Sequence, residues 1–299
     1  QYFDANMAWL DLNANLDISM GPHETYDDQL SGQKAFYKAN VLVVDPEAGA
    51  RLDNFKAAVP DLQANLPVPA AYHPDQTGTM TPLELADDVF RAGQGRAVME
   101  PVAFSLPNDP AVWAAKGAKK VIMRNFVDTR RNLVLNPLLA AILDDEANSW
   151  STPDGYFNWL LMHEVSHTLG PHTLVVDGKE VTVRQALGQL YQPIEEGKAD
   201  ITGLYNIRYL RKQGIDNETL EAHYAGFLSE ALRSIRFGPA SAYGLIRSAA
   251  WNYFVEQGAL TLDANSGRFS VDVDKMSAAV ESLMIKLITI EGEGDAYPT

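Results

Sequence analysis

Two histidines spaced four residues apart are candidate metal ligands in this sequence. They are His163 and His167 in the stretch NWLLMHEVSHTLG, residues 158–170, and Glu164 follows the first of them. On an α-helix, residues four apart lie on the same face, so both imidazoles can reach one ion. Glu164 would lie about 100° round the helix, close enough to contact a metal-bound water without binding the metal. By itself, this short H-E-x-x-H pattern is equally compatible with a core helix whose histidines bond to neighbouring groups.

The stretch IEEGKADITGLY, residues 194–205, supplies a third ligand. Glu196 and Asp200 are again four apart, on a second predicted helix. Because the chain has no cysteine, Glu196 would complete a tetrahedron of two histidines and one glutamate, with one position left open. Asp200, with Glu195 as a second candidate, would accept the other ring N–H of a ligand histidine. The alternative for Glu195 and Glu196 is a solvated helix N-terminus, where acidic residues suit the helix dipole.

Together the two motifs predict a site for one Zn2+ per chain and the hydrolysis of an amide bond. Zinc lowers the pKa of its water and polarises the scissile carbonyl. Glu164 would be the general base that takes a proton from this water and passes it to the leaving amine. The spacing does not say which amide is cleaved.

The composition limits the classes of partner. The chain has 299 residues, of which 46% are hydrophobic and 21% charged, and its formal net charge is -15. The acidic excess argues against a nucleic-acid surface, which needs basic residues to neutralise phosphates. No apolar run approaches the roughly 18 residues of a membrane span, so we expect a soluble protein of the cytoplasm or periplasm. Because the chain begins with Gln1 rather than Met, a removed targeting segment stays open and the compartment is unknown.

Most of the elements that must position the metal site are predicted to be helices. Hydrophobic periodicity predicts strands over residues 35–45, 96–107 and 119–125, and a helix over 46–67. Residues 81–93 have the capping and stop residues of another short helix. The remaining predicted helices cover residues 129–147, 156–169, 182–189, 193–213, 216–236, 240–257 and 273–290.

This pattern predicts an α+β fold that is predominantly helical. A helical zinc-binding lobe would be interleaved with a smaller α/β lobe, and the active site would lie in a cleft between them. We assign residues 1–37 and 90–128 to the α/β lobe, as part of a lower lobe, and residues 38–89 and 129–299 to the helical catalytic lobe.

The two motifs together resemble those of the dipeptidyl-peptidase III family of zinc exopeptidases. That family pairs an H-E-x-x-(x)-H helix with a later E-E-x-[R/K]-A-[E/D] helix, and EEGKAD, residues 195–200, fits every fixed position of the second motif. Segments at residues 21–45, 105–109, 117–125 and 240–260 are also similar to family segments, in the family's order. The resemblance implies that Glu196 is the zinc ligand and that dipeptides are released from the N-terminus of short peptides.

Several positions depart from the family pattern. The zinc motif has the five-residue H-E-x-x-H form, which a minority of members share. In the family, the helix that lines the substrate cleft, which residues 240–260 resemble, often carries a histidine where this chain has Tyr243. A phenol can still donate a hydrogen bond to an oxyanion. A family Glu-x-Tyr pair falls on Asp17 and Ser19, and Asp17 is a candidate substrate contact. Of two asparagines that would hold the peptide N-terminus, one falls on Ser105 and the other matches Asn108.

Other predictions concern substrate, partners and surface residues. Arg247 lies one predicted turn beyond Tyr243 and could hold a substrate carbonyl or oxyanion, or form a salt bridge. His73 and His223 are expected on the surface. The family usually begins with a further lobe, so we expect a C-terminal portion of a longer precursor whose N-terminal fragment could be a partner, beside the peptide substrate. The alternative functions are a zinc amide hydrolase or endopeptidase of other specificity, and a peptide-binding homologue with weak catalysis.

The spacing of the two motifs predicts about one zinc per chain, and it predicts that Glu196→Ala abolishes this binding because two ligands remain. Metal content measured after dialysis of the wild type and the variant checks this. Stoichiometric zinc in a protein that lacks both His163 and His167 would contradict the site.

Overall fold

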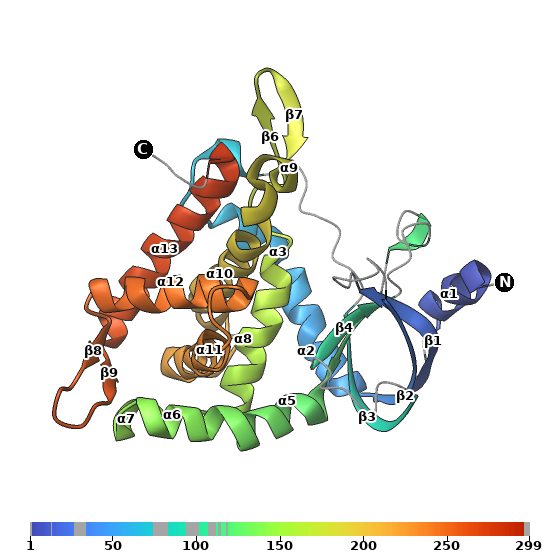
Figure 1. The fold of residues 1–299 in the computed structure, drawn as a ribbon, viewed down its shortest axis with the longest axis horizontal. Coiled ribbons are helices and arrows are strands. Elements are labelled where there is room, and N and C mark those ends of the chain that lie inside the picture. Colours follow the sequence, from blue (N-terminus) through green and yellow to red (C-terminus); the bar gives the residue numbers. More distant parts are fainter. Residues whose placement is uncertain are drawn as a thin grey trace. The chain divides into compact units, whose positions relative to one another are not determined.

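The computed structural model describes residues 2–12, 14–26, 34–73, 83–93, 102–106, 112, 115–117 and 119–295. The chain divides into two compact units. The sheet unit comprises Gln1–Asp53 and Met80–Arg130, and the helical unit comprises Asn54–Thr79 and Arg131–Thr299. A predominantly helical α+β fold is confirmed, because one mixed sheet accompanies a larger set of helices (Figure 1).

The sheet unit is built round a mixed five-stranded sheet with the strand order β1-β2-β3-β5-β4. Strands β3 and β5 are parallel, and the other neighbouring pairs are antiparallel. The strands are β1 (Leu16–Tyr26), β2 (Lys34–Val44), β3 (Leu83–Gly93), β4 (Ala103–Leu106) and β5 (Lys119–Met123), and helices α1 (Tyr2–Leu10) and α5 (Arg124–Arg130) accompany them. Their core comprises Leu42, Ala86, Phe104, Leu106, Val121 and Met123.

The helix predicted over residues 81–93 is wrong, since this segment forms β3. Leu83 and Leu85 are buried with the half-buried Glu84 between them, which is the two-residue period of a strand. Pairing with β2 on one side and β5 on the other overrides the local helix signals. Residues 38–89 were predicted to belong to the helical lobe. Because β2 and β3 join the sheet, residues 38–53 and 83–89 of this segment belong instead to the sheet unit.

The helical unit contains α8 (Pro153–Ser166), α10 (Tyr191–Lys212), α11 (Leu220–Ile235), α12 (Ala242–Glu256) and α13 (Val273–Glu293) as its long helices. Shorter helices are α3 (Val59–Ala64), α6 (Asn136–Ile142), α7 (Asp145–Ser149) and α9 (Val183–Leu187), and α2 (Pro46–Ala57) spans the boundary between the units. Two hairpins join β6 (Thr173–Val176) to β7 (Lys179–Thr182), and β8 (Leu260–Leu262) to β9 (Phe269–Val271). Among the helices described, none is both long and apolar enough to cross a membrane.

Helix α8 lies at the centre of the helical unit. It begins where the Thr152 side chain accepts a hydrogen bond from the Gly155 amide, and Pro153 occupies the first turn. Trp159, Leu161 and Met162 are fully buried. A helix that buries side chains on several faces must be surrounded by neighbours, and α10 and α11 both pack on it.

Glycines allow α10 and α11 to pack directly against the backbone of α8. A Cβ atom at Gly203 of α10 would lie 3.1 Å from the His163 amide nitrogen and from the Met162 carbonyl carbon. A Cβ atom at Gly226 of α11 would lie 2.9 Å from the Tyr156 Cα. The crossing at Gly203 therefore sets the separation between α8 and α10, the helices that carry the two metal motifs.

His223 is buried, so its predicted surface position is wrong. Its Nε2 lies 2.8 Å from Asp216 Oδ2, and its Nδ1 lies 2.6 Å from the Thr219 carbonyl oxygen. Asp216 also accepts a hydrogen bond from the Asn158 amide of α8. Two partners thus compensate the burial of a polar ring that sequence patterning places outside, and Asn158 holds one of them in place.

We expect Gly203→Ala to lower the free energy of unfolding by about 1 kcal/mol. The methyl group would push on the α8 backbone, at a typical overpacking cost of about 1–3 kcal/mol, and higher helix propensity would offset about 1 kcal/mol. Gly49→Ala is the control, because a Cβ there meets nothing within 4 Å, so it should stabilise. Denaturant unfolding followed by tryptophan fluorescence and circular dichroism measures both, and a stabilised Gly203→Ala would contradict the close crossing.

Candidate metal centre

Helices α8 and α10 bring three predicted ligands together. His163 Nε2 and His167 Nε2 lie 3.2 Å apart. Glu196 Oε2, from α10, lies 3.4 Å from the first nitrogen and 3.7 Å from the second. These three donor atoms form a triangle with nearly equal sides.

The triangle fits tetrahedral zinc. Zinc–nitrogen and zinc–oxygen bonds of roughly 2.0–2.1 Å at tetrahedral angles place neighbouring donors about 3.3 Å apart. Glu196 Oε2 is buried and has no hydrogen-bond partner among the residues described, so it is available to a cation. Histidine and carboxylate donors are also the set that zinc prefers where cysteine is absent. The chemistry and the spacing of the donors therefore both suit this metal.

Each ligand histidine is oriented by a carboxylate of α10. His163 Nδ1 lies 2.7 Å from Asp200 Oδ1, and His167 Nδ1 lies 2.7 Å from Glu195 Oε1. A ring whose Nδ1–H donates to a carboxylate leaves its Nε2 lone pair for a metal and is a stronger ligand. Each of the two acidic residues predicted for this task thus contacts one histidine, and their effect on a bound metal stays a prediction.

The electrostatics of the site favour a cation at the ring nitrogens. Burial lowers the pKa of His163, but the charge and hydrogen bond of Asp200, followed by Glu196, raise it to about 10. Burial raises the pKa of Asp200, yet Arg247 and then His163 hold it well below its usual range. Carboxylates that stay ionised beside buried imidazoles stabilise positive charge at Nε2, whether it is carried by a proton or by a metal.

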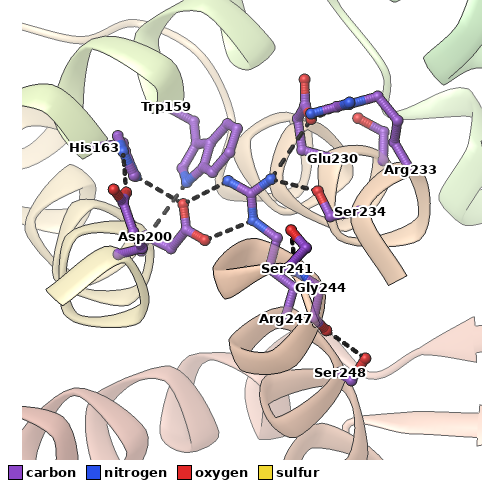
Figure 2. A network of polar contacts seen from close by, with 12 residues as sticks. Trp159, His163, Asp200, Glu230, Arg233, Ser234, Ser241, Gly244, Arg247 and Ser248 are labelled. Atoms are coloured by element: carbon purple, nitrogen blue, oxygen red, sulfur yellow. Dashed lines mark hydrogen bonds and ion pairs between the residues drawn. The ribbon is translucent and has the colours of Figure 1, made fainter. Parts of the chain in front are cut away.

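Arg247 belongs to the same network (Figure 2). Its Nε donates to Asp200 Oδ2 over 2.8 Å and its Nη2 to Oδ1 over 3.0 Å. Its Nη1 donates to Ser234 Oγ over 2.8 Å and lies 3.6 Å from Glu230 Oε2. Of the two alternatives, the structure shows a salt bridge, but with buried Asp200 rather than a surface acid. A contact of Arg247 with substrate stays a prediction.

Glu164 and Tyr243 border the donor triangle. A Glu164 carboxylate oxygen lies within 4.8 Å of a ring nitrogen of each ligand histidine. The Tyr243 ring, from α12, has its centroid 6.5 Å from that of His163, and Arg247 stacks over it. Burial and then the charge of Glu196 raise the pKa of Tyr243, so its phenol remains a hydrogen-bond donor at neutral pH. Both residues thus lie beside the donor triangle, and their catalytic roles stay predictions.

The other two predicted substrate contacts are Asp17 and Asn108. Asp17 lies in β1 of the sheet unit, buried, where it accepts hydrogen bonds from Trp9 Nε1 and Lys119 Nζ. Asn108 lies outside the described residues. The roles of these two residues therefore stay predictions.

The sequence did not predict which residues contact Arg247 and Glu195. Glu230 and Ser234 of α11 hold Arg247, while Lys198 of α10 and Glu291 of α13 surround Glu195. Lys198 is part of EEGKAD, so the motif itself gave a signal. Glu230, Ser234 and Glu291 lie on α11 and α13, and no local sequence pattern predicts how these helices pack against α10 and α12.

Two solved structures share this fold. The structure of DPP III from Caldithrix abyssi has a TM-score of 0.93 and 35% identity, over 98% of this chain and 56% of that chain. The structure of dipeptidyl-peptidase III from Corallococcus sp. strain EGB has a TM-score of 0.82 and 35% identity, over 99% of this chain and 55% of that chain. The resemblance to the dipeptidyl-peptidase III family is confirmed. It covers nearly all of this chain and includes both metal helices.

A curated protein is also similar to the chain. Nudix hydrolase 3 from Arabidopsis thaliana is 33% identical over 297 residues, which are 99% of this chain and 38% of that protein. No protein-family model matches the sequence. The chain thus spans about half the length of the two dipeptidyl-peptidase III structures and less than half of the plant protein.

Asp200→Asn should weaken zinc binding roughly 10- to 100-fold, because an amide accepts the His163 proton less strongly than a carboxylate. Asp216→Asn is the matched control, since it alters the other buried His–Asp pair of the same unit. Competition with a chromogenic chelator measures both affinities. The control should lose stability only, and equal zinc affinities for wild type and Asp200→Asn would refute the orienting role.

Proposed function

We propose that this chain carries the zinc centre of a peptidase that releases dipeptides from the N-terminus of short peptides. The triangle of His163, His167 and Glu196 donors is the observation that carries the proposal. The confirmed family resemblance and the names of the two structural neighbours support it. The chain spans about half the length of those neighbours, so dipeptide release by this chain is proposed here and is to be tested.

In this proposal His163, His167 and Glu196 hold one Zn2+, and Asp200 and Glu195 fix the two imidazole rings. Zinc, when bound, supplies a Lewis acid that polarises the scissile carbonyl and lowers the pKa of a water molecule. The protein supplies the rest: ligands locked by hydrogen bonds and a buried surrounding in which charges interact strongly.

Glu164 acts as the general base. It follows a ligand histidine on α8, and its carboxylate lies beside both rings, where it can remove the proton of the attacking water. The attack forms the new carbon–oxygen bond, and the same carboxyl group then passes this proton to the leaving amine as the carbon–nitrogen bond breaks. Tyr243 donates its phenolic hydrogen to the carbonyl oxygen as negative charge develops there.

Glu164→Ala should retain zinc and lose hydrolysis by about 10²–10⁴-fold, the usual contribution of a general base. The assay incubates dipeptidyl-naphthylamides and longer peptides with the zinc-loaded protein and identifies the products by mass spectrometry. We expect dipeptides to leave the N-terminus of wild-type substrates, and equal turnover by the variant would refute the base assignment.

The same products separate the other functions. Internal cleavage or release of single amino acids would replace the dipeptidyl specificity with an endopeptidase or another zinc amide hydrolase. Peptide binding without turnover, measured by calorimetry on the zinc-loaded protein, would identify a binding homologue. Either result would overturn the proposal while leaving the metal centre intact.

A further inference from the structure

Arg247 is a buried cation of α12 whose hydrogen-bond donors are directed at other side chains of the helical unit. Its exposed fraction is 5%. Two of its nitrogens, Nε and Nη2, donate to the two carboxylate oxygens of Asp200, and Nη1 donates to Ser234 Oγ. Its Cζ also lies 4.5 Å from the ring centroid of Tyr243 and 5.8 Å from that of Trp159. These contacts engage the guanidinium within the protein, which indicates a task other than holding a substrate.

One oxygen of Asp200 is shared by Arg247 and a ligand histidine (Figure 2). Asp200 Oδ1 lies 2.7 Å from His163 Nδ1 and accepts a 3.0 Å hydrogen bond from Arg247 Nη2. The second bond runs from Nε to Oδ2 over 2.8 Å. Two parallel bonds from a planar guanidinium hold a carboxylate in one orientation. Arg247 therefore determines where Oδ1 lies relative to the imidazole of His163.

Helix α11 holds the same guanidinium from another side. Ser234 Oγ accepts its 2.8 Å bond from Nη1, and this nitrogen lies 3.6 Å from Glu230 Oε2. Glu230 is itself fixed, because its Oε1 accepts a 2.6 Å bond from the Tyr156 hydroxyl and its Oε2 a 2.7 Å bond from Arg233 Nε. The position of Arg247 is thus set by α11 as well as by its own helix.

We propose that Arg247 is a positioning residue of the metal centre, which orients the imidazole of His163 through Asp200. Without the two parallel bonds, the Asp200 carboxylate turns about its side-chain torsions and its hydrogen bond to His163 weakens. The ring is then held less firmly, and its Nε2 lies less often at its corner of the donor triangle. Helices α11 and α12 thereby take part in metal binding, although neither supplies a ligand to the metal.

The test compares Arg247→Lys and Arg247→Met with Arg233→Met. Arg233 is a matched control, because it also approaches Glu230 Oε2 and its 2.7 Å bond goes to that atom rather than to Asp200. Zinc affinity is measured by chelator competition, and the visible absorption of the Co2+-loaded protein reports ligand geometry. We expect both Arg247 variants to bind zinc about three- to tenfold more weakly with a shifted cobalt spectrum, less than the roughly 10–100-fold loss typical for a direct partner of a ligand. Arg233→Met should change neither reading.

Arg247→Lys retains the charge but cannot form the two parallel bonds, so it isolates the effect of orientation if Arg247→Met folds poorly. Equal zinc affinity for wild type and Arg247→Lys would overturn the proposal, and so would an equal loss in Arg233→Met. An Asp200→Ala background completes a double-mutant cycle, in which Arg247→Lys should cause no further loss of affinity. An additive loss would show that Arg247 does not act through Asp200.

A role of Arg247 in substrate binding would give a different pattern. Arg247→Lys would then keep the zinc affinity and cobalt spectrum of the wild type and raise the KM for peptides, which would also overturn the proposal. The inference rests on the proposed zinc centre, and the metal measurements separate the two. A wild type that binds neither Zn2+ nor Co2+ would refute the centre itself. A wild type that binds one zinc, with Arg247→Lys indistinguishable from it in metal binding, would refute only the role of Arg247.

Discussion

Two imidazole nitrogens and a carboxylate oxygen lie within 3.2–3.7 Å of one another at the crossing of α8 and α10. Both rings have their Nδ1 atoms engaged by carboxylates, so their Nε2 lone pairs face each other, an arrangement that a cation makes favourable. The remainder of the helical unit must keep these groups in place. Gly203 permits the close crossing, and the buried side chains of α8 prevent the helix from rotating.

A similar series of contacting side chains leads away from each of the two histidines. His163 contacts Asp200, which contacts Arg247, which approaches Glu230. His167 contacts Glu195, which contacts Lys198, which approaches Glu291. In each series a cation lies between acidic side chains, and burial together with Glu195 raises the pKa of Glu291 well above its usual range, which limits the cost of burying charge. The members come from α8, α10, α11, α12 and α13, so every long helix of the unit contributes to holding the two rings.

Spacing within one helix was enough to predict the centre of this arrangement. The four-residue intervals of His163 to His167 and of Glu196 to Asp200 are local properties, and the structure places all four side chains at one site. The partner of Arg247 and the burial of His223 depend on how helices pack, which no local pattern contains. The strand at residues 83–93 was missed for the same reason, because its pairing with β2 and β5 outweighs local signals that suit a helix.

The residues with predicted roles in the chemistry are distributed over both units of the chain. The helical unit contains the donor triangle, both carboxylates that contact its imidazoles, Glu164 and Tyr243, so the proposed metal binding and proton transfer draw on one unit. Asp17, a predicted substrate contact, belongs instead to the sheet unit. In the proposed function, substitutions at these residues of the helical unit would act on the metal and the rate, whereas Asp17 is held by Trp9 and Lys119 and shares no hydrogen bond with the two imidazoles. The departures from the family pattern at Ser19 and Ser105 also lie in the sheet unit, in β1 and β4.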